Sequence, residues 1–153
     1  METLTEMVKS YLDSQEWHYQ INEAKEVGDD NVISLGFNLE HERVSVYILL
    51  DETSMTYRIR SMPDLNKPIE EDFGILKAVN QYNSKRAFIK LTLDKDNDLC
   101  FGMDGIIYDL NKGMKYFVAD LDIVLKEVDN ETAQILRHAE HKSGGVLSKI
   151  FGK

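Results

Sequence analysis

Two hydrophobic periods alternate along the chain and predict its secondary structure. Apolar side chains near the N-terminus recur every three or four residues, which is the spacing of one helix face. They are Leu4, Met7, Val8, Tyr11 and Leu12. Thr3 and Glu6 have the spacing of a capping box, so we expect a helix that starts there and ends between Ser14 and Glu16.

After this helix the hydrophobic period shortens to two residues. Apolar and polar side chains alternate over residues 17–21, 33–39, 44–50 and 55–59, and short polar segments separate these runs. Alternation of this kind is typical of strands with one face buried and the other in water. The pattern therefore predicts three or four strands joined by short turns in an antiparallel meander.

A second helix is expected after the only loop that contains prolines, residues 63–68, with Pro68 in its first turn. Its apolar positions cover about half of the helix circumference, more than the usual stripe. One edge of this arc is Ile69, Phe73 and Leu76, and the other is Ile75, Val79 and Tyr82. A helix this apolar is expected to contact more than its own sheet.

Two more strands and a long helix complete the predicted fold. The strands, residues 89–93 and 99–103, flank an acidic hairpin at residues 94–98. Apolar side chains then share one helix face over residues 114–136, which favours a single helix of about 25 residues. The order is α-β-β-β(β)-α-β-β-α, which is typical of the α+β class with an antiparallel sheet.

The end of the chain differs from the rest in charge. Residues 137–153 carry four basic side chains and one acidic side chain, a net +3, and the preceding 136 residues carry −12 of the total of −9. Gly144 and Gly145 predict a flexible joint. Beyond it, four apolar residues are spaced as one face of a short helix: Val146, Leu147, Ile150 and Phe151.

We therefore divide the chain into an α+β domain, residues 1–141, and a basic amphipathic tail, residues 142–153. Four apolar side chains are unusual at a solvated terminus. They predict a tail that docks on a protein or contacts a membrane peripherally, although a tail of this length also frays when nothing holds it.

Composition narrows the classes of function. The 153 residues are 42% hydrophobic and 29% charged, which suits one packed domain. The net charge of −9 argues against a nucleic-acid partner, because such binding depends on neutralising phosphates. We find no apolar run of membrane-spanning length and no signal peptide. The single cysteine, Cys100, cannot form an internal disulfide and fits a cytoplasmic protein.

Patterns that could bind an ion or catalyse a reaction have simpler explanations. The acidic hairpin at residues 94–98 has the spacing of a calcium loop but lacks its glycine and its final glutamate. His138 and His141 could meet on one helix face, yet no zinc-protease motif surrounds them. Cys100 lies between apolar strand residues, where a thiol is inert. We expect no catalytic residue, no metal site and no cofactor.

The segment AVNQYNSKRAFIKLTLDKDNDLCF resembles the YbjN family of bacterial domains. In that family a helix ends in an Asn-x-x-Asn pattern, here Asn80 and Asn83, and a strand, an acidic hairpin and a second strand follow. Asn97 stands where the family hairpin has glycine, and asparagine tolerates the same left-handed conformation. The resemblance covers about residues 3–140. It implies a fold like that of type III secretion chaperones, and often a homodimer.

The resemblance implies a non-enzymatic protein-binding or regulatory module concerned with bacterial sensory transduction. One alternative is a chaperone that binds an unfolded segment of a secreted effector. A small metal-dependent or hydrolytic enzyme is a third and less favoured alternative. We expect a homodimer or an unidentified protein partner. The predicted partner or dimer surface combines a sheet face with an apolar helix surface. Its candidate residues on the second and last helices are Phe73, Ile75, Val79, Tyr82 and Ile123.

Overall fold

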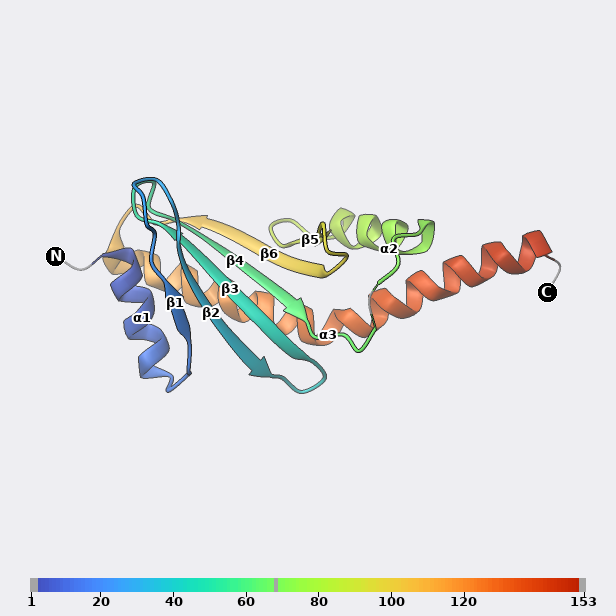
Figure 1. Ribbon diagram of the computed structural model, residues 1–153, viewed down its shortest axis with the longest axis horizontal. Helices are drawn as coiled ribbons and strands as arrows, with labels where there is room; N and C mark the ends of the chain where they lie inside the picture. Colours follow the sequence, from blue (N-terminus) through green and yellow to red (C-terminus); the bar gives the residue numbers. More distant parts are fainter. Residues whose placement is uncertain (1–2, 68, 152–153) are drawn as a thin grey trace.

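The computed structural model describes residues 3–67 and 69–151, and beyond Glu140 it describes the backbone alone. In these residues three helices and six strands form an α+β fold in the predicted order (Figure 1). The helices are α1 (Leu4–Ser14), α2 (Phe73–Ser84) and α3 (Leu110–Phe151). The strands are β1 (Gln20–Asn22), β2 (Asn31–Asn38), β3 (Arg43–Asp51), β4 (Thr56–Pro63), β5 (Lys90–Leu93) and β6 (Leu99–Ile106).

The strands make one antiparallel sheet in the order β1-β2-β3-β4-β6-β5, so the predicted meander is confirmed. Buried and accessible residues alternate along β3 and β4, because one face of the sheet meets the helices and the other does not. In Figure 1, α3 runs across the back of the sheet while α1 and α2 lie toward its two ends. The three helices thus bury a single face of the sheet.

Aromatic rings join the helices to the buried face of the sheet. Tyr57 of β4 and Tyr11 of α1 both meet Phe117 of α3 edge to face, with ring centroids 5.2 Å and 6.4 Å away. Tyr82 of α2 meets Phe101 of β6 in the same way at 5.5 Å. These contacts place α1, α2, α3 and the sheet around one hydrophobic core.

Local hydrogen bonds form where the sequence predicts them. Thr3 and Glu6 make the reciprocal capping box at the start of α1. In the acidic hairpin, the carboxylate of Asp94 accepts hydrogen bonds from the backbone N–H groups of Asp96 and Asp98, each at 2.9 Å. Asn97 has a φ of 62°, the left-handed conformation expected of it. The hairpin interpretation of this acidic segment is confirmed.

The predicted start of α2 near Pro68 is wrong. The helix begins at Phe73, where the side chain of Asp72 accepts a hydrogen bond from the backbone N–H of Ile75 at 2.9 Å. Pro68 itself lies outside the described residues. Glu70 and the residues around it precede the helix instead of forming its first turn. Asp72 sets the start of the helix because its carboxylate satisfies a backbone N–H donor that would otherwise be unpaired.

The predicted length of the last helix and the predicted joint within the tail are also wrong. Helix α3 has 42 residues and continues through Gly144 and Gly145 to Phe151. Glycine disfavours a helix by about 1 kcal/mol relative to alanine, but an established helix propagates across such positions because each added residue gains a backbone hydrogen bond. Two consecutive glycines therefore do not by themselves divide this helix.

Candidate interaction surface

One face of the sheet lies free of the three helices. Along one register row, six residues from all six strands follow one another across it: Gln20, Ser34, Tyr47, Arg60, Gly102 and Lys90. The neighbouring outward positions add Gly36, Ser45, Arg58, Thr92, Cys100 and Asp104. We refer to these twelve residues as the open sheet face.

Two shallow hollows lie on the open sheet face. The larger has a volume of about 470 Å³, with Ser34, Gly36 and Ser45 among its lining residues. The smaller, of about 210 Å³, is lined by Arg60, Phe88, Lys90, Thr92, Cys100, Gly102 and Asp104. Tyr47 lines the larger hollow and Arg60 the smaller, and these two residues are direct cross-strand partners. The face therefore carries two hollows, one lined by Tyr47 and the other by its cross-strand partner Arg60.

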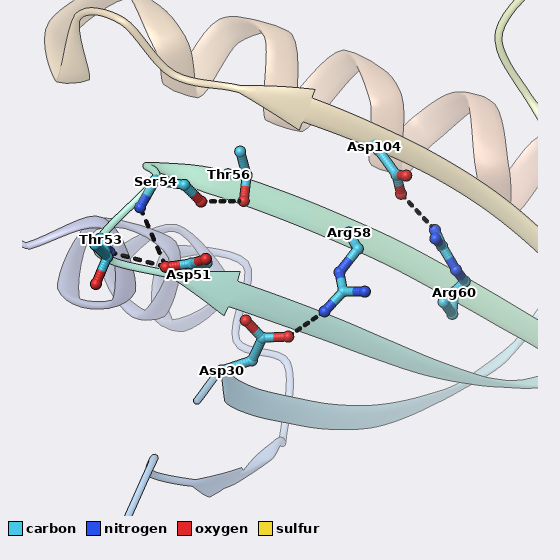
Figure 2. A network of polar contacts seen from close by, with 8 residues as sticks. All are labelled: Asp30, Asp51, Thr53, Ser54, Thr56, Arg58, Arg60 and Asp104. Atoms are coloured by element: carbon cyan, nitrogen blue, oxygen red, sulfur yellow. Dashed lines mark hydrogen bonds and ion pairs between the residues drawn. The ribbon is translucent and has the colours of Figure 1, made fainter. Parts of the chain in front are cut away.

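Ion pairs hold the arginines of the open sheet face in place (Figure 2). Arg58 of β4 pairs with Asp30, just before β2. The Arg60 guanidinium reaches the carboxylate of Asp104 on β6 at 2.7 Å and passes over Gly102, where a Cβ atom would lie 2.7 Å from Nη1. Both cations therefore have partners within the chain, and the local charge is close to balanced.

The turn between β3 and β4 lies at one end of this face (Figure 2). The carboxylate of Asp51 accepts hydrogen bonds from the backbone N–H groups of Thr53 at 2.9 Å and Ser54 at 3.1 Å. Hydrogen bonds from the side chain and backbone of Ser54 lower the pKa of Asp51 below its ordinary value. The carboxylate stays ionised and stabilises the turn, so it is not free to act as a general acid or base.

The structure divides the predicted partner surface between core and solvent. Ile75 and Tyr82 are buried, and Val79 is half-buried. Phe73 is 64% exposed and Ile123 is 42% exposed. Phe73 lies on α2 and Ile123 on α3, so the two exposed members of the predicted surface come from different helices.

Tyr82 belongs to a polar contact between α2 and α3. Its hydroxyl donates a hydrogen bond to Glu127 at 3.2 Å, and the guanidinium of Arg86 lies 4.6 Å from its ring centroid. Arg86 in turn bonds Glu127 at 2.5 Å and lies 3.4 Å from Glu131. Burial, followed by the nearby Glu127 charge, raises the pKa of Tyr82 well above its ordinary value. This tyrosine therefore joins two helices of the same chain.

The predicted tail residues Val146, Leu147, Ile150 and Phe151 lie on the helical backbone of α3. Their side chains are outside the described residues, as is the side chain of His141. The other histidine of that pair, His138, has its Nε2 atom 2.5 Å from the side-chain oxygen of Gln81 on α2. The described part of the molecule thus gives His138 a role in helix packing.

One group of described residues has the donors for a metal ion. Atoms of Glu40, His41 and Asp129 lie within 4.8 Å of one another, and no ion is needed to explain this arrangement. One oxygen of Asp129 accepts hydrogen bonds from the backbone N–H groups of His41 at 2.7 Å and Glu42 at 2.9 Å. The carboxylate therefore fastens the β2–β3 turn to α3.

Cys100 is the free thiol of the chain and lies buried on β6. Burial raises the pKa of this thiol above its ordinary value, so it stays protonated and is a poor nucleophile at neutral pH. Cys100 lines the smaller hollow together with Thr92, its cross-strand partner, and Gly102.

Reasoning from the sequence predicted that a sheet face takes part in the partner surface, but it did not identify the residues of the open sheet face. The available signal was the run of serine and glycine at alternate positions of two consecutive predicted strands, Ser34, Gly36 and Ser45. Small side chains in strands mark places where another backbone or a ligand approaches closely. Their pairing across β2 and β3, however, depends on the register of the sheet.

Comparison with known proteins tests whether the chain belongs to a known family. Among the described residues, no helix combines the length and the apolarity needed to span a bilayer. No curated protein matches the chain. The model of the YbjN family, whose description is "putative bacterial sensory transduction regulator", matches residues 5–114, from α1 into the first turns of α3. Since this match includes more than half of the sequence, the chain belongs to the YbjN family.

Proposed function

We propose that this chain is a non-enzymatic regulatory module that binds a protein partner through the open sheet face. The observation that carries the proposal is the pair of hollows on a sheet face that the chain's own helices leave bare. A bare face is common in antiparallel sheets. On this one, Tyr47 is 37% exposed, and Phe88, which lines the smaller hollow, is 81% exposed. Aromatic residues are enriched in protein interfaces, where they bury a large area at low entropic cost.

The charges of the face favour a protein partner over a small-molecule substrate. Arg58 and Arg60 are already paired with Asp30 and Asp104, so a partner need not supply their counter-charges. The hollows are shallow, and the charged side chains Arg60 and Asp104 of the smaller one pair with each other. A regulatory role accords with the family description, and the buried reduced thiol of Cys100 accords with a cytoplasmic location.

The experiment compares three forms of the tagged full chain in affinity purification from its native host, with quantitative mass spectrometry. Ser45→Arg places a long cationic side chain in the larger hollow at an exposed position. Asn130→Arg adds the same side chain at an exposed position of α3, on the helical side of the molecule. We expect the partner with the wild type and Asn130→Arg and its loss with Ser45→Arg. Equal recovery by all three forms would refute the proposal.

A chaperone that captures an extended client segment is the second candidate. Such a client adds a strand to a free sheet edge. At the β5 edge, Asn83 already bonds the backbone of Leu91, and β1 at the other edge has only three residues. These edges favour a partner that docks on the face. A partner that tolerates Ser45→Arg but is lost with Ile21→Pro in β1 would favour the chaperone instead.

A further inference from the structure

The C-terminal end of α3 extends beyond the rest of the molecule. At 1.5 Å per residue, the 42 residues of α3 measure about 63 Å. The helix packs on the sheet and α2 as far as Ala139, which is buried, and its last turns project past α2 in Figure 1. We refer to residues 141–151 as the arm. In Figure 1 the arm has no neighbouring element of the described chain beside it.

An apolar groove lies where the arm leaves the body. It has a volume of about 700 Å³ and lies between α3 and the segment that leads into α2. Its apolar lining residues are Leu65, Ile69, Ile75, Leu136 and Ala139. Its acidic lining residues are Glu70, Asp72 and Glu140, against the single cation Lys67. The groove therefore fits a segment that is apolar on one side and basic on the other.

The arm has that composition. Its sequence contains Lys142 and Lys149, no acidic residue, and the four apolar residues at helical spacing noted above. Amphipathic helices bind apolar grooves through residues at this spacing, and opposite charges at the rim fix their orientation. The arm cannot enter its own groove, because Leu136 and Ala139 of the groove belong to the same continuous helix and the arm leads away from them.

We propose that two copies of this chain exchange their arms, each arm lying in the groove of the other copy. The two α3 helices then run antiparallel, with residues 136–140 of one copy beside residues 146–150 of the other. Such pairing places the twofold axis near residue 143, at the sequence Ser143-Gly144-Gly145. Small residues at a crossing point let two helices approach closely, which accounts for glycines in a helix interior.

The size of the proposed contact suits a stable dimer. Each copy contributes the eleven residues of the arm and the ten residues that line the groove. Specific protein interfaces typically involve about 20–30 residues on each side. The proposal concerns a surface separate from the open sheet face, so either can fail while the other stands.

Sedimentation velocity of the full chain over a range of concentrations tests the proposal. The arm variant is Lys142→Glu/Lys149→Glu, and the groove variant is Glu70→Lys/Glu140→Lys. The control, Lys95→Glu/Lys112→Glu, has the same change in net charge as the arm variant. Both of its positions are exposed and lie outside the arm and outside the groove. We expect a dimer for the wild type and the control, and dissociation constants raised about tenfold or more for the arm and groove variants.

Mixing the two variants separates exchange between copies from binding within one copy. In a mixed dimer, the glutamates of one arm meet the lysines of the other groove, and the second contact has its natural charges. We therefore expect an equimolar mixture to regain the affinity of the wild type. If the arm bound its own groove, mixing would restore nothing and the proposal would be wrong.

Three further results would overturn the proposal. They are a wild-type monomer at about 100 μM, a dimer that the arm variant leaves unchanged, and a monomer that co-sediments through its arm with phosphatidylglycerol vesicles. The last result would identify an anionic membrane as the occupant that the arm prefers. Circular dichroism of each variant checks that the fold is retained, because all substituted positions described by the structure are exposed.

Discussion

The side chain of Asn83 shows how one residue can join two elements. Its amide donates to the backbone carbonyl of Leu91 at 2.8 Å and accepts from the N–H of the same residue at 2.7 Å. It thus occupies the outer edge of β5 in the way a neighbouring strand would, which protects that edge from pairing with another chain.

We expect Asn83→Ala to lower the free energy of unfolding by about 1–3 kcal/mol, because two part-buried backbone groups of Leu91 lose their partner. Urea denaturation measures the change, and hydrogen exchange of the Leu91 amide reports its cause. Asn80 is the matched control: it belongs to the same family pattern but is exposed, so Asn80→Ala should change stability by less than about 0.5 kcal/mol. Equal losses for the two variants would contradict this account.

Gly105 of β6 is required by the ring of Tyr57, its cross-strand partner. A Cβ atom at Gly105 would lie 2.2 Å from Cζ of that ring, which is 1% exposed and cannot move aside. We expect Gly105→Ala to cost about 1–3 kcal/mol in thermal or urea unfolding through overpacking. Gly36→Ala is the control, because its nearest contact would be an ordinary 3.5 Å from the carbonyl oxygen of Val44. A neutral Gly105→Ala would show that the sheet adjusts to the added methyl group.

At the scale of elements, two tyrosines connect α3 to its neighbours. The Tyr57 hydroxyl of β4 donates to Asp120 at 2.5 Å, and the Tyr82 hydroxyl of α2 donates to Glu127 at 3.2 Å. Burial is the main cause that raises the pKa of each hydroxyl far above 10, and the partner carboxylates add to it. These hydroxyls therefore stay protonated in the folded chain at pH values where they ionise in the unfolded chain.

This difference predicts alkaline destabilisation. Above about pH 10 the unfolded chain loses tyrosine protons that the folded chain retains, so the free energy of unfolding falls as pH rises. Each tyrosine contributes up to about 1.4 kcal/mol per pH unit. Urea titrations between pH 8 and 12 should show a shallower fall for Tyr82→Phe than for the wild type. An unchanged slope for Tyr82→Phe would refute the prediction.

At the scale of the whole molecule, α3 connects the other two helices with the sheet. It contacts α1, α2 and the sheet, and it alone extends beyond them (Figure 1). The family match ends at residue 114, near its start. The arm therefore lies outside the matched segment, whereas the groove residues between Leu65 and Ile75 lie inside it. Arm exchange is a proposal about this chain and not about its family.

Two glycine substitutions within α3 should have opposite effects. Gly144→Ala/Gly145→Ala replaces helix-disfavouring residues and should raise helicity, stabilising the last turns by about 1 kcal/mol per site. Gly113→Ala lies in the same helix but would place its Cβ atom 2.2 Å from Cγ2 of buried Ile107, so it should destabilise the fold. Circular dichroism and backbone chemical shifts measure both effects. Coil-like shifts for residues 141–151 of the wild type would contradict a continuous α3.

The sequence by itself determined the order of the elements, since a change in hydrophobic period is a local property that burial then reinforces. The capping box at Thr3 and Glu6 and the left-handed Asn97 were predictable for the same reason, because each depends on residues a few positions apart. Only the tertiary structure decided which edge of α2 is buried. Both edges are apolar, and the packing of α2 on α3 and β5 covers Ile75 and Tyr82 while it leaves Phe73 in water.

The open sheet face and the groove were likewise decided by tertiary structure. Ser34, Tyr47 and Arg60 become neighbours through strand register, which brings together residues up to 26 positions apart. The groove joins a loop near residue 66 to a helix near residue 138, a contact that no local pattern encodes. Local free energies set where helices and strands form, and the burial of apolar area shared by distant segments sets which surfaces remain exposed to bind a partner.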